Sequence, residues 1–186
     1  MEMKKVWAMY FSPTGGTEKV VRGTADALAA KLNLPVEVYD FTLPQVREKE
    51  AVFGEGDIVV VGTPVIAGRV PNVLLPYLEG KIKGNGALAV PMVSFGNRNF
   101  DDALIELRNL MEANGFKTVA GGAFISEHSF SKTLAAGRPD EKSFVPPTTI
   151  IPVTLFLLLI TVSSCCNRSF DLPDCFLLSS ILSLSL

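Results

Sequence analysis

Buried-strand patterns alternate with helix patterns along the first 124 residues, and this alternation constrains the fold more than any other feature of the sequence. Apolar runs of strand length occupy residues 4–11, 35–41, 56–65, 86–96 and 117–124. Segments with helical spacing lie between them, at residues 17–32, 71–80 and 100–115. Near-continuous apolar strands separated by helices are typical of a parallel sheet covered on both faces. We therefore predict a single doubly wound α/β domain.

Charge and cysteine placement exclude several classes of protein. The net charge of -2 provides no basic surface, so nucleic acid is not an expected partner. The amino terminus passes directly into a strand pattern without a signal-peptide pattern, which predicts a cytoplasmic protein. Cys165, Cys166 and Cys175 lie near the carboxyl end without the spacing of a metal site or of a four-iron cluster. We expect neither a metal site nor an iron–sulfur centre.

The segment "SPTGGT" lies between the first predicted strand and the first predicted helix. Such a loop leaves backbone N–H groups unpaired at the positive end of the helix dipole, which favours an anion. Gly15 and Gly16 allow close approach of a ligand, while Ser12, Thr14 and Thr17 add uncharged hydroxyl donors. A phosphate monoester suits this set, because the loop lacks a Walker lysine and a dinucleotide glycine pattern. For this loop alone, a simple turn with Thr14 or Thr17 capping the helix is equally consistent.

Two further polar loops follow the third and fourth predicted strands. They span Gly62–Pro71 ("GTPVIAGRVP") and Ser94–Leu104 ("SFGNRNFDDAL"). In an open parallel sheet, ligands bind beyond the carboxyl ends of the strands, next to the point where the strand order reverses. We therefore expect all three loops to share one edge of the sheet.

Five motifs in order now make a family resemblance specific. They are "FSPTGGTEKVV", "GTPVIAGRVP", "SFGNRNFDDAL", "AFISEHSFS" and "AAGRPDEK". Over about residues 4–142 the chain resembles a flavodoxin, and most closely the flavodoxin-like half of flavodoxin/ferredoxin fusion proteins. The resemblance implies a five-stranded sheet of order 2-1-3-4-5. It also implies FMN as cofactor at the switch point, a placement taken over from flavodoxins themselves.

By this resemblance, the FMN phosphate would be held by Ser12, Thr14, Gly15, Gly16, Thr17 and the backbone of Glu18. The flavin ring would lie between two loops, formed by Thr63, Pro64, Val65, Ile66, Ala67 and Gly68 and by Ser94, Phe95, Gly96, Asn97, Arg98 and Phe100.

Particular positions in these loops have implied roles. Phe95 suits an aromatic contact with the ring, whereas Ile66 stands where an aromatic is expected, which would weaken binding by about 0.5–1.5 kcal/mol. A backbone carbonyl of Ala67–Gly68 is the candidate partner for the flavin N5. Arg69 and Arg98 would either raise the flavin potential or face solvent or a partner.

The resemblance implies an FMN-binding electron carrier whose partner is a redox protein, either ferredoxin-like or a reductase. Two alternatives are open. The chain could be an FMN-dependent NAD(P)H reductase of a quinone-like acceptor, or a truncated remnant that no longer binds flavin. No residue in the three loops is an obvious general acid, base or nucleophile, and we interpret His128, the single histidine, as a surface residue.

The composition changes near residue 147. Residues 1–147 hold 33 charged side chains, whereas residues 148–186 hold three, so we divide the chain into a flavodoxin-like domain and an apolar tail. The last helix expected of a flavodoxin is predicted to be missing or replaced by this tail. Three interpretations of the tail are open: a membrane anchor, makeshift cover for the sheet, or an out-of-frame translation. Membrane attachment is not expected of the domain itself.

Overall fold

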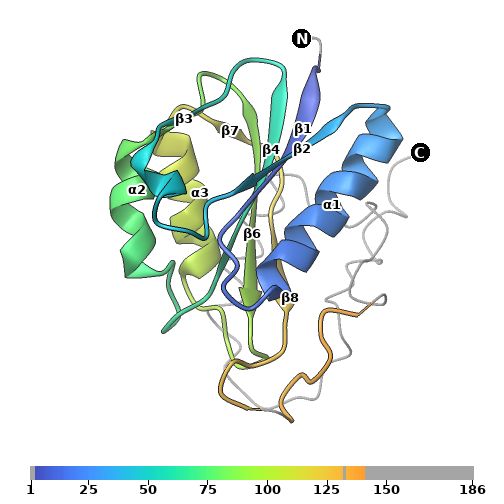
Figure 1. The fold of residues 1–186 in the computed structure, drawn as a ribbon, viewed down its shortest axis with the longest axis vertical. Helices are drawn as coiled ribbons and strands as arrows, with labels where there is room; N and C mark the ends of the chain where they lie inside the picture. Colours follow the sequence, from blue (N-terminus) through green and yellow to red (C-terminus); the bar gives the residue numbers. More distant parts are fainter. Residues whose placement is uncertain (1–2, 132, 141–186) are drawn as a thin grey trace, which may run out of the picture.

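The computed structural model describes residues 3–131 and 133–140. Its main sheet is parallel and has the order β2-β1-β4-β6-β7, with β8 also paired to β6 (Figure 1). This confirms the predicted order 2-1-3-4-5. The strands are β1 (Lys5–Tyr10), β2 (Val36–Asp40), β4 (Asp57–Pro64), β6 (Leu88–Phe95), β7 (Lys117–Thr118) and β8 (Gly122–Ile125).

The fifth predicted strand is split into β7 and β8, which both pair with β6. Between them lie residues 119–121, followed by Gly122 at the start of β8, and glycines weaken a strand interior because they add no side-chain packing. A second small sheet, which the sequence did not predict, joins β3 (Ala51–Val52) to β5 (Ile82–Lys83). Dipeptide strands are too short for a periodic sequence signal.

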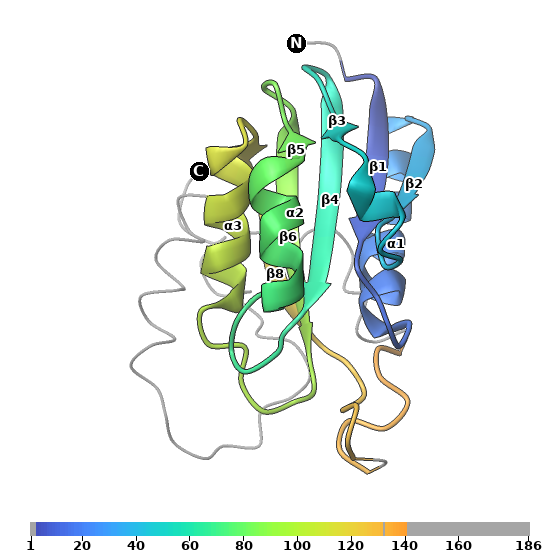
Figure 2. The ribbon, with the colours of Figure 1, turned by 60° about the vertical axis from the view of Figure 1, so that its left-hand side comes forward.

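Helices cover both faces of the main sheet. Helix α1 (Gly16–Leu32) packs on one face, while α2 (Leu75–Gly80) and α3 (Ala103–Ala113) pack on the other (Figure 2). The predicted helix at residues 71–80 consists of a 3-10 turn, η2 (Asn72–Leu74), followed by α2. A second 3-10 turn, η1 (Val46–Glu48), precedes β3.

The apolar spacing of α1 explains where it docks. Val20, Val21, Ala25 and Ala29 are buried, and the last three recur every four residues, so they form one face against β1, β4 and β6. The helix ends at Asn33, which adopts a left-handed conformation with φ 54°. Left-handed residues commonly terminate helices, with asparagine as an accepted substitute for glycine.

Gly62 in β4 allows α1 to approach the sheet closely. A side chain built there would place its Cβ 2.2 Å from Val21 Cγ2 and 3.1 Å from Thr17 Cγ2. Real Cβ atoms do not approach other atoms this closely, so the absence of a side chain is required for the observed packing. The first turn of α1 consequently lies directly over the carboxyl end of β4.

Several predictions fall outside the described residues. They are the boundary at residue 147, the nature of the tail at residues 148–186, the absence of a last helix and the three cysteines. Within the described part of the chain, no helix has the length and apolar character needed to cross a membrane.

Candidate functional site

The loops after β1, β4, β6 and β8 emerge at the same edge of the main sheet, at the bottom of Figure 1. Strand β1 lies between β2 and β4, and the helices that follow β1 and β4 lie on opposite faces. The strand order therefore reverses between β1 and β4. This is the position at which an open α/β sheet forms a ligand crevice.

The N-cap residue of α1 provides no side chain to cap the helix. This residue is Gly15, which has φ 83° and provides no capping oxygen. Within residues 3–131 and 133–140, the N–H groups of Gly16 and Thr17 donate no hydrogen bond. The alternative in which Thr14 or Thr17 caps the helix is thus not found. Two aligned backbone donors remain for an anion at the positive end of the helix.

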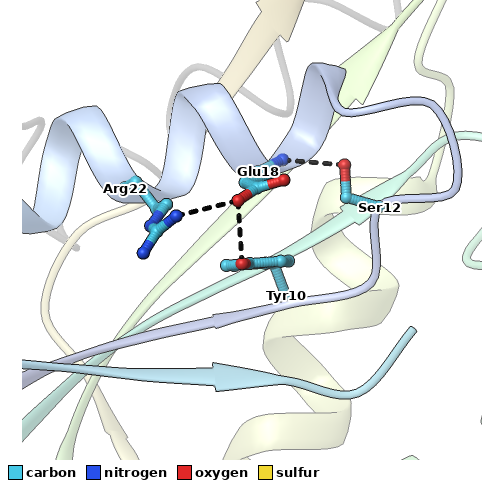
Figure 3. A network of polar contacts seen from close by, with 4 residues as sticks. All are labelled: Tyr10, Ser12, Glu18 and Arg22. Carbon is cyan, nitrogen blue, oxygen red and sulfur yellow. Dashed lines mark hydrogen bonds and ion pairs between the residues drawn. The ribbon is translucent and has the colours of Figure 1, made fainter. Parts of the chain in front are cut away.

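Ser12 shapes the loop rather than pointing freely out of it. Its Oγ accepts a hydrogen bond of 2.9 Å from the backbone N–H of Glu18 (Figure 3). Its own N–H donates to Thr42 Oγ1 at 2.9 Å. The Glu18 N–H, which the resemblance assigned to the phosphate, therefore has a partner within the protein. The Ser12 hydroxyl proton remains available as a donor.

The Glu18 carboxylate is held by two other side chains. Its Oε1 accepts a hydrogen bond of 3.0 Å from Tyr10 Oη and one of 2.9 Å from Arg22 Nη1, as Figure 3 shows. Burial, followed by the hydrogen bond to Glu18, raises the pKa of Tyr10 to about 12. Tyr10 is therefore a protonated donor at neutral pH. Arg22 balances the Glu18 carboxylate of the first turn of α1, which reduces the repulsion of an anion by that carboxylate.

Thr17 connects the loop to the end of β6. Its Oγ1 lies 2.6 Å from Ser94 Oγ, and both residues are buried. One hydroxyl of the pair donates to the other, so one hydroxyl proton of the two is left for a further acceptor. The structure thus brings together a residue predicted for the phosphate and one predicted for the flavin ring.

The loop after β4 forms a tight two-residue turn. Ile66 and Arg69 exchange backbone hydrogen bonds of 3.0 and 3.1 Å, and the central residues Ala67 and Gly68 have φ 52° and 76°. The Gly68 carbonyl accepts a hydrogen bond from the Asp102 N–H. The Ala67 carbonyl accepts none from the described residues, so it is the free member of the predicted pair.

Arg69 does not face the loops as a free cation. It forms two hydrogen bonds with Glu106 of α3, at 3.0 and 2.6 Å, and Glu106 also accepts the Val70 N–H. The hydrogen bond from Arg69 is the main cause that lowers the pKa of Glu106. The positive charge of Arg69 is therefore balanced locally by Glu106, which would reduce any effect of Arg69 on a flavin potential. Arg98 is exposed and has no partner among the described residues.

The Arg69–Glu106 pair borders an open groove beside α3, which Asp102 and Asn109 also line. This groove lies on the sheet face opposite to α1. It is therefore separate from the candidate anion site.

Aromatic and apolar residues are unequally placed around the two flavin-binding loops of the prediction. Phe95 is half-buried and contacts Phe100, with ring centroids 5.4 Å apart. Ile66 is 57% exposed and Asn97, with φ 56°, is also exposed. Pro64, Val65 and Gly96 are half-buried at the same edge. Between these two loops, the β6 loop carries the aromatic rings, Phe95 and Phe100, and the β4 loop, Thr63–Gly68, carries none.

Two buried hydroxyls at this edge have no hydrogen-bond partner, Thr63 Oγ1 and Ser126 Oγ. Thr63 belongs to the predicted set, but Ser126 does not. Ser126 lies against Gly16, since a Cβ at Gly16 would be 3.1 Å from its Oγ. His128, interpreted as a surface residue, packs against Gly96 in the same way. The motif "AFISEHSFS" contained both residues, but nothing in it indicated this contact.

The donor set suits a phosphate monoester. It combines the unpaired N–H groups of Gly16 and Thr17, the Thr17–Ser94 hydroxyl pair with one proton to spare, and the buried Ser126 hydroxyl, which has no hydrogen-bond partner. The loop contains no lysine. Among the described residues, no three histidine, cysteine or acidic side chains gather as metal ligands.

Comparison with solved structures identifies the architecture. The structure of a flavodoxin from the domain Archaea matches with a TM-score of 0.55 at 16% identity, covering 76% of this chain and 88% of that chain. This chain has the flavodoxin fold. A flavodoxin from Streptococcus pneumonia TIGR4 matches with a TM-score of 0.48 at 20% identity, covering 70% of this chain and 88% of its own. A putative flavoprotein from Bacteroides uniformis matches with 0.49 at 16% identity, covering 68% and 93%. No protein-family model and no curated protein matches the sequence.

Proposed function

We propose that this chain is an FMN-binding electron-transfer protein of the cytoplasm. The observation that carries the proposal is the pair of unpaired N–H groups, from Gly16 and Thr17, at the amino terminus of α1. They lie at the strand-order reversal of a flavodoxin fold and are surrounded by hydroxyls. Likeness to an archaeal flavodoxin supports the fold on which this function depends. The finer likeness to the flavodoxin half of flavodoxin/ferredoxin fusion proteins rests on the five sequence motifs.

The residues of the three loops would have distinct roles. The N–H groups of Gly16 and Thr17 and the hydroxyls of Ser12 and Thr14 would donate to the phosphate. Phe95 would contact the flavin ring, and the Ala67 carbonyl would accept a hydrogen bond from a protonated nitrogen of the ring. FMN itself supplies one- or two-electron transfer when it is bound.

The proposed partners are redox proteins, either ferredoxin-like or a reductase. The two ring-binding loops expose a cation, Arg98, and an apolar side chain, Ile66. Both are suitable for contact with such a protein. The absence of a general acid, base or nucleophile in these loops favours a carrier over an enzyme with a substrate of its own.

The test is a fluorescence titration of FMN with the full chain, compared with riboflavin, which lacks the phosphate. We expect quenching that saturates at one FMN per chain. Thr14→Ala should weaken the FMN affinity about tenfold or more, because a hydrogen bond to a charged group contributes about 1.5–3 kcal/mol. Riboflavin affinity should not change, and neither should FMN affinity in Thr24→Ala, a matched change further along α1.

Three outcomes separate the hypotheses. A folded protein that does not quench FMN fluorescence would refute flavin binding and support the hypothesis of a truncated remnant. Quenching together with steady NAD(P)H oxidation would indicate the reductase. Quenching with reversible flavin reduction and no such oxidation would support the carrier.

A further inference from the structure

Ser126 has a buried hydroxyl that nothing in the described protein satisfies. The residue is 7% exposed, and its Oγ is inaccessible and without a hydrogen-bond partner. An unpaired buried hydroxyl destabilises a folded protein, so its presence in a well-packed region calls for an acceptor or donor that is absent here.

The hydroxyl lies against the first residue of α1. A Cβ on Gly16 would be 3.1 Å from Ser126 Oγ and 3.2 Å from Ser126 Cβ, so Ser126 occupies the space that a side chain at Gly16 would need. In a helix the Cα–Cβ bond tilts toward the amino terminus, which is also the direction of the free N–H groups of the first turn. Ser126 Oγ therefore lies against the first turn of α1, the turn that carries those groups.

The backbone fixes Ser126 in this position from both sides. Its own N–H donates to the Phe95 carbonyl at 2.8 Å, at the end of β6. The following residue, Glu127, donates its N–H to Arg138 and accepts the Gly137 N–H with its carboxylate. The hydroxyl is thus presented by a structured segment, and its place does not depend on a free loop.

We propose that Ser126 is a further binding residue of the anion site at the amino terminus of α1, and that it donates its hydroxyl proton to a phosphate monoester. The site then takes donors from two sides: the Gly16 and Thr17 N–H groups from α1, and Ser126 from the exit of the fifth strand. Gly16 has a second role, since a Cβ at this position would press on Ser126 Oγ at 3.1 Å and require it to move by a few tenths of an ångström. The inference rests on the proposed function for the carrier of the phosphate, FMN, while the anion chemistry follows from the site itself.

The experiment compares the full chain with Ser126→Ala, using FMN, riboflavin and inorganic phosphate as separate probes. Ser129→Ala is the matched control, because Ser129 is an exposed serine of the same segment. We expect Ser126→Ala to weaken FMN binding about tenfold or more and to leave riboflavin binding unchanged. The unliganded Ser126→Ala protein should melt no lower than the wild type, because the hydroxyl has no partner to lose.

The outcomes distinguish this inference from the proposed function. If the wild type binds FMN and Ser126→Ala binds it equally well, the role of Ser126 is refuted and the function stands. If the wild type does not bind FMN, the function fails. Inorganic phosphate then decides the inference: shifts of the Gly16 amide signal that weaken in Ser126→Ala support it, and an unresponsive Gly16 signal refutes it. A lower melting temperature of the unliganded variant would also contradict it, because it would show a structural hydroxyl.

Discussion

Gly62→Ala should show how strongly the position of α1 depends on a missing side chain. The new methyl group would lie 2.2 Å from Val21 Cγ2, about 1.2 Å short of the 3.4 Å at which ordinary contact begins. Val21 is fully buried, and β-branched side chains in helices have one strongly preferred χ1 rotamer. Val21 therefore cannot rotate away, and α1 must shift from the sheet.

The expected destabilisation is about 1–3 kcal/mol, the usual cost of overpacking a core. This is a substantial part of the roughly 5–15 kcal/mol that stabilises a domain. Because Thr17 lies one turn before Val21 and also faces Gly62, the shift should also lengthen the 2.6 Å contact of Thr17 with Ser94 and weaken anion binding.

Urea unfolding followed by circular dichroism measures the free energy of unfolding. Gly54→Ala is the matched control, because a Cβ there has no neighbour within 4 Å, and its stability should stay within about 0.5 kcal/mol of the wild type. In the double variant with Val21→Ala, which removes the obstructing methyl group, the two effects should be less than additive by about 1 kcal/mol or more. Full stability of Gly62→Ala, or strict additivity in the cycle, would refute the steric argument.

Three further predictions concern the polar contacts. The pKa of Tyr10 is raised to about 12, so its protonated form stabilises the fold below pH 10, and this stabilisation is lost as the pH rises toward 12. In Tyr10→Phe, the free energy of unfolding should therefore fall less between pH 10 and 12 than in the wild type. The pKa of Glu106 is lowered from its ordinary value of 4.5, so the ionised carboxylate stabilises the fold above pH 4.5 and this stabilisation is lost as the pH falls further. Glu106→Gln should be less stable than the wild type at pH 7 and should lose less unfolding free energy in acid. A variant with the same acid profile as the wild type would contradict the pairing with Arg69. Thr17→Val should lower the free energy of unfolding by about 1–3 kcal/mol, because the Ser94 hydroxyl would stay buried without a partner. In the same urea assay, the double variant with Ser94→Ala should recover part of this loss.

Much of the fold was predictable because its determinants are local. The apolar strands and the amphipathic face of α1 follow from residue spacing, and each predicted helix and main strand has a counterpart in the structure. The interruption of a strand and the pairing of very short strands were less predictable. The split of the fifth strand into β7 and β8 and the dipeptide sheet of β3 and β5 depend on which neighbours each backbone meets.

The candidate site shows the same division. The residues of the "SPTGGT" loop and their place between strand and helix were visible in the sequence, and the exposed Ile66 lies where an aromatic was expected. The hydrogen-bond and ion-pair partners of these side chains were not visible in the sequence. The sequence could not show that Glu106 balances Arg69, or that Ser12 takes the Glu18 N–H.

The sequence by itself determined the order of strands and helices and the chemical types of the loop residues, because apolar periodicity and turn-forming residues act over a few positions. The tertiary structure decided which hydroxyls meet. Thr17 and Ser94 are separated by 77 positions, and Ser126 reaches Gly16 from the far end of the sheet order. These contacts depend on how closely α1 sits on the sheet, and that distance is set by the absence of a side chain at Gly62.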